Sequence, residues 1–331
     1  MIAWESYDGY RFPNGTIFDA ISNVPGMSYR LYRGVESPVV GSVPIVAALH
    51  NISLDDTNMY ENFATDVAQA SYPYNYTFIE PNYGDTSNNT YSGGMSQHPM
   101  DNVMNGEQLI WDTYSAIRNS PHWQSSVLII TYDEHGGFYD HITPPSATPP
   151  GDTTPGSTYN QYGFTFGQYG VRVPAIVISP FVPANTIDHR QYDHSSIPAT
   201  LEALFGLPSL TARDAGAKNL TPLFSAAEAR TDCVSEPPPA VALAFAAKKL
   251  ADAAAPPPAQ NAPGSDDPLP PSGNLLGFLH IARKTQLQNT PPPLQAAVLA
   301  NFQTIQTRGQ AKAYIESVMN AHNAKQAAAG S

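Results

Sequence analysis

Short apolar runs separated by polar turns recur along the first 230 residues of the chain. Residues 127–130 (Val-Leu-Ile-Ile) and residues 173–179 predict two buried strands. Residues 27–33 alternate between polar and apolar positions, which predicts a third strand. The remaining patterned segments are a strand at 76–81 and helices at 16–23, 61–70, 101–119 and from about 196. Because helices and strands alternate, we expect an α/β fold with a mostly parallel sheet.

The most informative stretch is residues 131–141, Thr-Tyr-Asp-Glu-His-Gly-Gly-Phe-Tyr-Asp-His. It places two adjacent carboxylates, Asp133 and Glu134, directly after the predicted strand 127–130. In open α/β sheets, ligands bind beyond the carboxyl ends of the strands. Carboxylates and imidazoles crowded at such a place indicate a metal or phosphate site. Two glycines then let the chain turn sharply, so that Asp140 and His141 can return toward the same place.

The bulk composition limits the classes of partner. Charged residues make up only 13% of the chain, and the net charge is −12. An acidic chain without basic clusters argues against nucleic acid as a partner. Cys233 is the only cysteine, so an intrachain disulfide cannot form. No apolar run approaches the roughly 18 residues of a membrane span, and the first residues lack the features of a signal peptide.

Several motifs together resemble the phosphoesterase family, the bacterial phospholipase C and acid phosphatase group related to alkaline phosphatase. The stretch 132–141 matches that family's Tyr-Asp-Glu-(Asn/His)-Gly-Gly-Phe-(Phe/Tyr)-Asp-His signature almost without a break. Other matching motifs are Thr-Ile-Phe-Asp at 16–19, Phe-Ile-Glu-Pro at 78–81, Arg-Val-Pro at 172–174 and Asp-His-Ser at 193–195. The resemblance covers about residues 10–225.

This resemblance implies a fold and an activity. The expected fold is an alkaline-phosphatase-like three-layer α/β/α sandwich. The expected reaction is hydrolysis of a phosphate ester by a Ser or Thr nucleophile, assisted by a divalent metal ion whose identity the sequence does not reveal. The substrate is expected to be a phosphate-ester small molecule or a phospholipid head group. Relatives of this kind are exported, so the expected location is extracytoplasmic, either secreted or periplasmic.

The resemblance also implies roles for individual residues. Asp133 and Glu134 match the acidic pair that binds metal, and the alternative is a solvated turn. His98, in a His-Pro motif, resembles the histidine that faces the phosphate, and the alternative is an ordinary loop histidine. His194 is a second catalytic candidate, or it caps the following helix together with Asp193.

Three further residues are expected to lie next to the metal ligands and to orient them or their loop: His135, Asp140 and His141. A purely structural Asp140–His141 pair is the alternative, and His135 stands where many relatives have Asn. The other histidines are expected to have no role in the chemistry, with His122, His189, His280 and His322 at the surface.

The sequence departs from the family at its beginning. In the family, a long segment with a Glu-Asn metal-binding pair and the nucleophile precedes the Thr-Ile-Phe-Asp motif, which here begins at Thr16. We therefore expect an N-terminally incomplete catalytic domain that lacks the nucleophile and half of the metal ligands. The alternative is a noncatalytic or truncated descendant that serves as a binding or scaffold module. The predicted division is a partial catalytic domain at 1–230, a Pro/Ala-rich linker with a short helix at 231–273 and a small helical appendage at 274–331.

Overall fold

The centre of the protein is a three-stranded parallel sheet. The computed structural model describes residues 9–34, 39–152, 160, 162–254 and 264–329. The strand order is β2-β1-β3, with β1 at Tyr29–Arg33, β2 at Thr57–Met59 and β3 at Tyr76–Glu80. Leu31 of β1 pairs with Thr57 on one side and with Phe78 on the other. The mixed α/β fold with a parallel sheet, expected from the sequence, is confirmed.

Strands β4 (Leu128–Thr131) and β5 (Ala175–Ile178) form a separate antiparallel pair. Both were predicted as strands, but their burial was predicted wrongly: β4 is only half-buried, and Ile176 of β5 is 54% exposed. A parallel pair needs a crossover connection, usually a helix. The described residues between β4 and β5 contain no helix, so the chain returns in the opposite direction.

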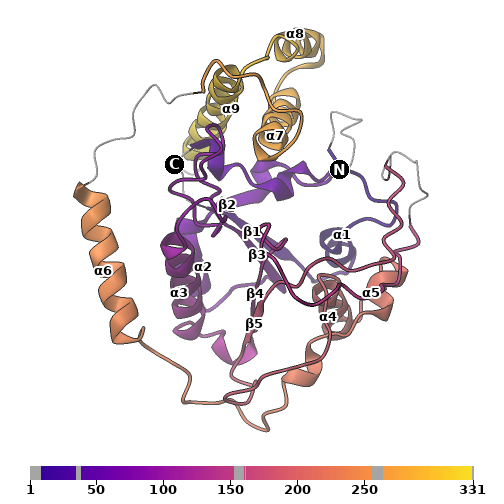
Figure 1. The fold of residues 1–331 in the computed structure, drawn as a ribbon, viewed down its shortest axis with the longest axis vertical. Coiled ribbons are helices and arrows are strands. Elements are labelled where there is room, and N and C mark those ends of the chain that lie inside the picture. Colours follow the sequence, from indigo (N-terminus) through magenta and orange to yellow (C-terminus); the bar gives the residue numbers. More distant parts are fainter. Residues whose placement is uncertain (1–8, 35–38, 153–159, 161, 255–263, 330–331) are drawn as a thin grey trace.

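Helices cover both sides of the parallel sheet (Figure 1). One side carries α2 and α3, and the other side carries α1, α4 and α5. Their bounds are α1 Ile17–Ser22, α2 Phe63–Val67, α3 Met104–Arg118, α4 Ser196–Phe205 and α5 Ala212–Gly216. Helix α6 (Pro239–Ala254) stands at the edge of the molecule and contacts α3. This arrangement agrees with the expected layers of helix, sheet and helix.

Local sequence signals explain where two of these helices begin or end. Thr16 and Asp19 form a reciprocal capping box at the start of α1, since each side chain bonds the backbone amide of the other. Gly206 ends α4 in a left-handed conformation with φ of 66°, which glycine adopts without steric cost. Both helices lie within the segments for which the sequence predicts helices.

Three helices lie at the C-terminal end: α7 (Asn274–Gln288), α8 (Pro292–Phe302) and α9 (Arg308–Ala329). Two of them, α7 and α9, pack against the segment that connects β1 to β2. Phe278 of α7 and Ile315 of α9 are fully buried in one cluster with Val43 and Leu54. Burial of apolar surface stabilises this contact by roughly 25 cal/mol per Å². The C-terminal helices and residues 40–54 therefore share a core, while the division at residues 231 and 273 stays a prediction.

A buried lysine adds polar contacts to this core. Lys284, in α7, is 1% exposed. Its ammonium group makes these contacts. It donates hydrogen bonds to the carbonyl oxygens of Ala47, Leu49 and Ile52 at 3.0, 2.6 and 2.6 Å. Three acceptors compensate for the burial of a charged group, which otherwise costs several kcal/mol.

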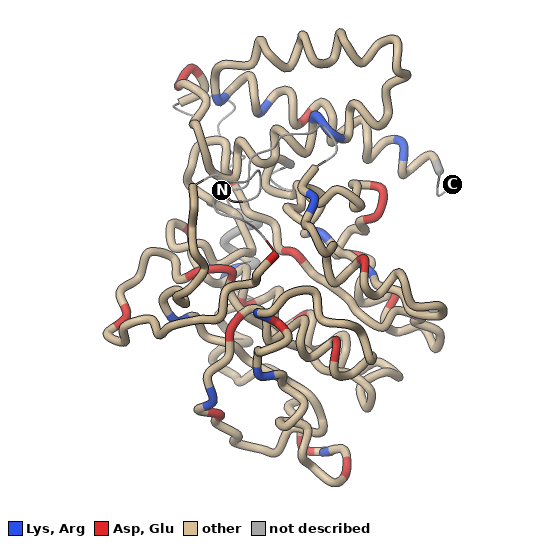
Figure 2. The backbone as a smooth tube through the Cα atoms, turned by 90° about the vertical axis from the view of Figure 1, so that its right-hand side faces the viewer, with Lys and Arg blue, Asp and Glu red and all other residues tan. Residues whose placement is uncertain are grey.

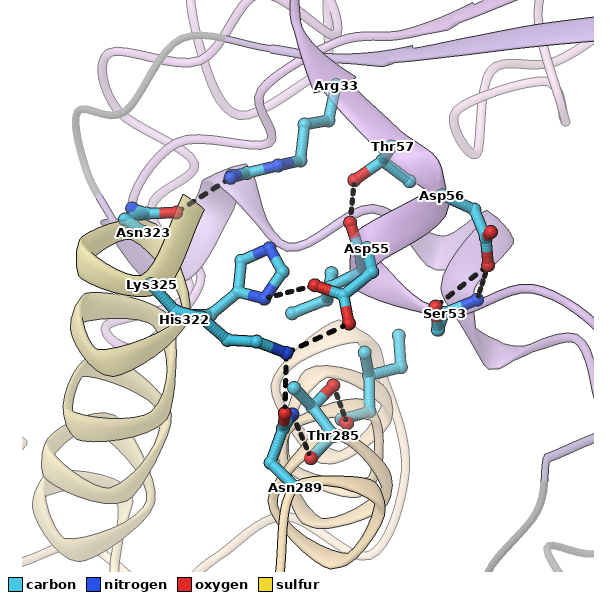
Figure 3. Close-up of polar contacts among 12 residues, drawn as sticks. Arg33, Ser53, Asp55, Asp56, Thr57, Thr285, Asn289, His322, Asn323 and Lys325 are labelled. Atoms are coloured by element: carbon cyan, nitrogen blue, oxygen red, sulfur yellow. Dashed lines mark hydrogen bonds and ion pairs between the residues drawn. The ribbon is translucent and has the colours of Figure 1, made fainter. Parts of the chain in front are cut away.

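The prediction that His322 lies at the surface is wrong. His322 is 3% exposed, because α9 presses it against the 3₁₀ turn Leu54–Asp56. Figure 3 shows its ring facing Asp55, with Nδ1 3.5 Å from a carboxylate oxygen, while Lys325 reaches the other oxygen at 3.5 Å. Beside it, Arg33 at the end of β1 donates to the side-chain oxygen of Asn323 at 2.8 Å. Burial lowers the pKa of His322.

Charged residues are spread over the molecule, with Lys and Arg scattered along the chain (Figure 2). Among the described residues, no helix combines the length and the apolar character that a membrane crossing requires.

Candidate phosphate-ester site

Tyr132, the first residue after β4, contacts the segments of both predicted catalytic histidines. Its hydroxyl donates to the side-chain oxygen of Gln97, the neighbour of His98. Its carbonyl oxygen lies 2.7 Å from Nε2 of His194, so the imidazole donates this hydrogen bond through Nε2. Gln97 and His194, which are far apart in the sequence, therefore both bond the residue that follows β4.

The glycine turn brings the acidic loop against the His-Pro motif. Gly136 has φ of 66°, and a Cβ atom at this position would lie only 2.6 Å from Cγ of Pro99. Tyr132 and Gly136 thus contact the residues on either side of His98, namely Gln97 and Pro99. The segment that carries His98 therefore packs against the 132–136 loop through the residues on either side of the histidine.

The imidazole of His98 is itself held in place. Its ring stacks on that of Tyr91, and its Nδ1 accepts a hydrogen bond from the Met100 amide at 3.3 Å. An imidazole that accepts at Nδ1 carries its proton on Nε2. Nε2 is thus the nitrogen that can donate to a ligand.

The two adjacent carboxylates sit at the exposed start of the turn. Asp133 accepts a hydrogen bond from the Glu134 amide at 3.0 Å, and Glu134 accepts one from the Gly136 amide at 2.8 Å. Both side chains are exposed and take one bond each from their own loop. Within the described part of the chain, no group of three or more His, Cys, Asp or Glu residues is arranged to hold a metal ion. These residues therefore do not make up a complete metal centre.

Behind the acidic loop lies a buried carboxylate, Glu80, at the end of β3. It accepts hydrogen bonds from the amides of Ile45 and Val46, the latter at 3.0 Å, and from the Tyr83 hydroxyl at 2.7 Å. Burial raises the pKa of Glu80, and the negative charge of Asp133 adds to the effect. Burial and the charges of Glu80 and Asp133 likewise raise the pKa of Tyr83. The negative charge of Asp133, after β4, thus acts on the buried Glu80 at the end of β3.

Asp140 and Arg172 fix the far end of the loop. The guanidinium donates to both carboxylate oxygens of Asp140, at 2.6 and 2.8 Å. This fork and the Ile142 amide hold the pKa of Asp140 well below its usual range. The side chain of His141 is 76% exposed, and its Nδ1 lies 3.5 Å from Asp140. Asp140 thus orients the loop through Arg172.

An open depression of about 380 Å³ lies between this loop and the approach to β5. His135 lines it, and its Nδ1 lies 3.0 Å from the carbonyl oxygen of Phe138, so that this nitrogen donates. The other lining residues are Phe138, Tyr139, Asp140 and residues 171–174. Ligand sites commonly have volumes of about 300–1,000 Å³. The depression is large enough for a phosphorylated head group.

Three residues in this neighbourhood carry no role in the sequence-based prediction: Gln97, Tyr132 and Arg172. Gln97 and Tyr132 flank predicted residues, and their contact closes a separation of 35 positions that no local pattern shows. Arg172 belongs to the Arg-Val-Pro motif that supports the resemblance, but its pairing with Asp140 depends on the antiparallel return of the chain.

Comparison with known proteins identifies the class to which this fold and site belong. The Phosphoesterase family matches residues 2–208, so the chain belongs to this family. It is 35% identical to non-specific phospholipase C6 of Arabidopsis thaliana over 244 residues, which cover 67% of this chain and 43% of that protein. It is 34% identical to non-specific phospholipase C3 of the same plant over 236 residues, with the same two shares.

A bacterial protein gives a shorter match. Phospholipase C B of Mycobacterium tuberculosis is 37% identical over 142 residues, which cover 40% of this chain and 27% of that protein. The chain therefore spans less than half the length of the plant relatives that it matches.

Proposed function

We propose that this chain forms part of a phospholipase C-type site that hydrolyses phosphate esters, with the phosphodiester of a phospholipid as its substrate. The observation that carries the proposal is the contact of the 132–136 loop with the residues on both sides of His98. This contact brings the His-Pro segment against the acidic loop that follows β4, and α/β sheets bind ligands beyond the carboxyl ends of their strands. The relatives are named phospholipases C, which favours a phospholipid over a phosphomonoester.

In this proposal the residues have distinct tasks. His98 donates from Nε2 to a phosphoryl oxygen and stabilises the negative charge that develops there. His194 holds the Tyr132 carbonyl and so fixes the end of β4. His135 and Asp140, with Arg172, shape the wall of the depression, and His141 lies outside it. The attacking hydroxyl is not assigned to any residue of this chain.

Asp133 and Glu134 stay the proposed contacts for a divalent cation. Two adjacent carboxylates rarely hold such an ion alone, since hard cations take six or more oxygen ligands. Because the described residues offer no third ligand of the required kind, no step of the reaction is assigned to the ion.

As an exported protein, the chain would meet phospholipids at an extracytoplasmic membrane surface.

The test compares binding with turnover. The chain is assayed with p-nitrophenyl phosphate and with p-nitrophenyl phosphorylcholine, with and without divalent cations, and the affinity for inorganic phosphate is measured separately. We expect the diester to be hydrolysed in preference to the monoester. We expect His98→Asn to weaken phosphate binding. The control is His122→Asn, because the His122 ring bonds the Gln69 carbonyl, and it should change neither the substrate preference nor the phosphate affinity. Phosphate binding without turnover supports the alternative, a noncatalytic binding module. No binding at all contradicts both.

A further inference from the structure

Tyr91 and His98 form a close parallel stack. Their ring centroids lie 3.4 Å apart, and the planes differ by 5°. Tyr91 is 9% exposed, whereas His98 is half-buried, so one face of the imidazole is covered by a fixed ring. Perfectly superposed rings are less favourable than offset ones, which makes this arrangement unusual unless other contacts impose it.

The backbone around Tyr91 does impose it. Tyr91 has φ of 56°, a left-handed conformation that is rare for a bulky residue. Its amide donates to the Asp85 carbonyl at 3.1 Å, and its carbonyl accepts from the Gly94 amide at 3.1 Å. A side chain at Gly84 would overlap the Tyr91 carbonyl, so the turn depends on that glycine. Strained conformations of this kind persist where the surroundings fix them, and they cluster at functional sites.

A second contact fixes the rotation of the imidazole within its own plane. The Met100 amide donates to Nδ1 of His98 at 3.3 Å. The stack sets the plane of the ring, and this hydrogen bond sets which nitrogen faces outward. Together they leave the ring with a single orientation, in which Nε2 carries the proton.

We propose that Tyr91 is a positioning residue, which holds the His98 imidazole in the plane from which Nε2 donates to a phosphoryl oxygen. The inference rests on the proposed function of His98. Because the aromatic face makes the contact, the tyrosine hydroxyl is not required. A ring whose orientation is fixed before the ligand arrives loses less conformational freedom on binding.

The test uses the full chain with ¹³C-labelled histidine and follows the His98 imidazole protons by NMR. A stacked aromatic ring shifts these protons upfield. We expect Tyr91→Phe to keep the upfield shift and the phosphate affinity. We expect Tyr91→Leu, with the same backbone strain, to lose the shift and to weaken inorganic phosphate binding by about 2- to 10-fold. Tyr91→Gly suits the positive φ and provides a second ring-free variant if Tyr91→Leu does not fold.

A matched control separates positioning from general stability. Tyr60→Leu removes another stacked aromatic, whose ring centroid lies 5.8 Å from that of Phe63. It is expected to lower the melting temperature without changing the His98 shifts or the phosphate affinity. If the imidazole shifts are unchanged in Tyr91→Leu, the two rings do not stack in solution. If Tyr91→Phe binds phosphate more weakly than the wild type, the ring face alone does not position His98. Absence of any phosphate response in the wild-type chain instead contradicts the proposed function.

Discussion

Arg172 donates hydrogen bonds to both carboxylate oxygens of Asp140, at 2.6 and 2.8 Å, and so connects the segment before β5 to the end of the acidic loop. Paired hydrogen bonds of this kind fix geometry as well as adding attraction. Since the pKa of Asp140 is lowered in the folded state, the pair persists from neutral pH to below the ordinary aspartate pKa of about 3.9. It is lost only as the pH falls through the lowered value.

Substitution of Arg172 by Gln tests this tie. We expect faster hydrogen exchange at the Ile142 amide, which donates to Asp140 at 3.1 Å, with little change in the melting temperature because the Arg172 side chain is 62% exposed. The control is Arg190→Gln, which breaks a similar fork between Arg190 and Asp188. Equal exchange at Ile142 in the wild type and Arg172→Gln would show that the loop is held by other contacts.

The two glycines of the turn allow a matched comparison. Gly136 and Gly137 both have positive φ, so alanine costs about 1 kcal/mol at either position. Only at Gly136 would the new Cβ press on the Pro99 ring, since nothing lies within 4 Å at Gly137. We expect Gly136→Ala to displace the His-Pro segment and weaken phosphate binding, measured by calorimetry. Gly137→Ala should lose similar stability and keep the affinity, and equal affinities in both variants would contradict the contact.

Lys284 is expected to be essential for the C-terminal core. Lys284→Met leaves three carbonyl oxygens without their buried donor, and we expect a loss of about 3–5 kcal/mol in unfolding free energy. Lys325→Met removes a lysine that is 57% exposed, and a change below about 1 kcal/mol is expected. Urea unfolding measures both. Similar small losses would mean that water replaces the ammonium group easily.

Because of His280, we expect the stability of the fold to depend on pH. His280 is partly buried, contrary to the prediction that it lies at the surface. Burial, assisted by the positive charge of Arg283, lowers its pKa to about 4. An unfolded histidine titrates near 6.5, so the unfolded state takes up the proton first as the pH falls. This contribution to stability is intact above about pH 6.5 and decreases toward pH 4. Between pH 7 and pH 5, the protonation of His280 in the unfolded state should lower the unfolding free energy by about 2 kcal/mol.

His280→Gln should remove this contribution. Its unfolding free energy, measured with urea at both pH values, is expected to fall less between pH 7 and 5 than that of the wild type. Identical decreases in the two proteins would show that His280 titrates normally in the folded state.

The sequence predicts most elements of the α/β part, because their signals are local, but it does not predict β2 (Thr57–Met59). The capping pair Thr16–Asp19, the β-branched run of β4 and the stop at Gly206 each depend on neighbouring residues. The contact of Gln97 and Pro99 with the 132–136 loop has no such local signal. No periodic pattern links positions that far apart.

Other features depend on contacts that local patterns do not encode. The antiparallel return of β5 follows from a long connection without a described helix, and it leaves both strands more exposed than their apolar sequences indicate. His322 lies on a helix with ordinary polar spacing, yet it is buried because α9 packs on a turn near the start of the chain. Tyr91 lies in a loop rich in Gly and Asn, where nothing marks it as a partner of His98.

The most direct test of the account is a titration of the labelled chain with inorganic phosphate, followed by NMR at two places at once. The His98 imidazole and the Gly136 amide belong to segments that meet only in the folded protein. We predict that both signals shift along one binding curve with a single dissociation constant, and that His98→Asn weakens the response at Gly136. If only one of the two signals responds, or if neither does, these segments do not form a common phosphate site.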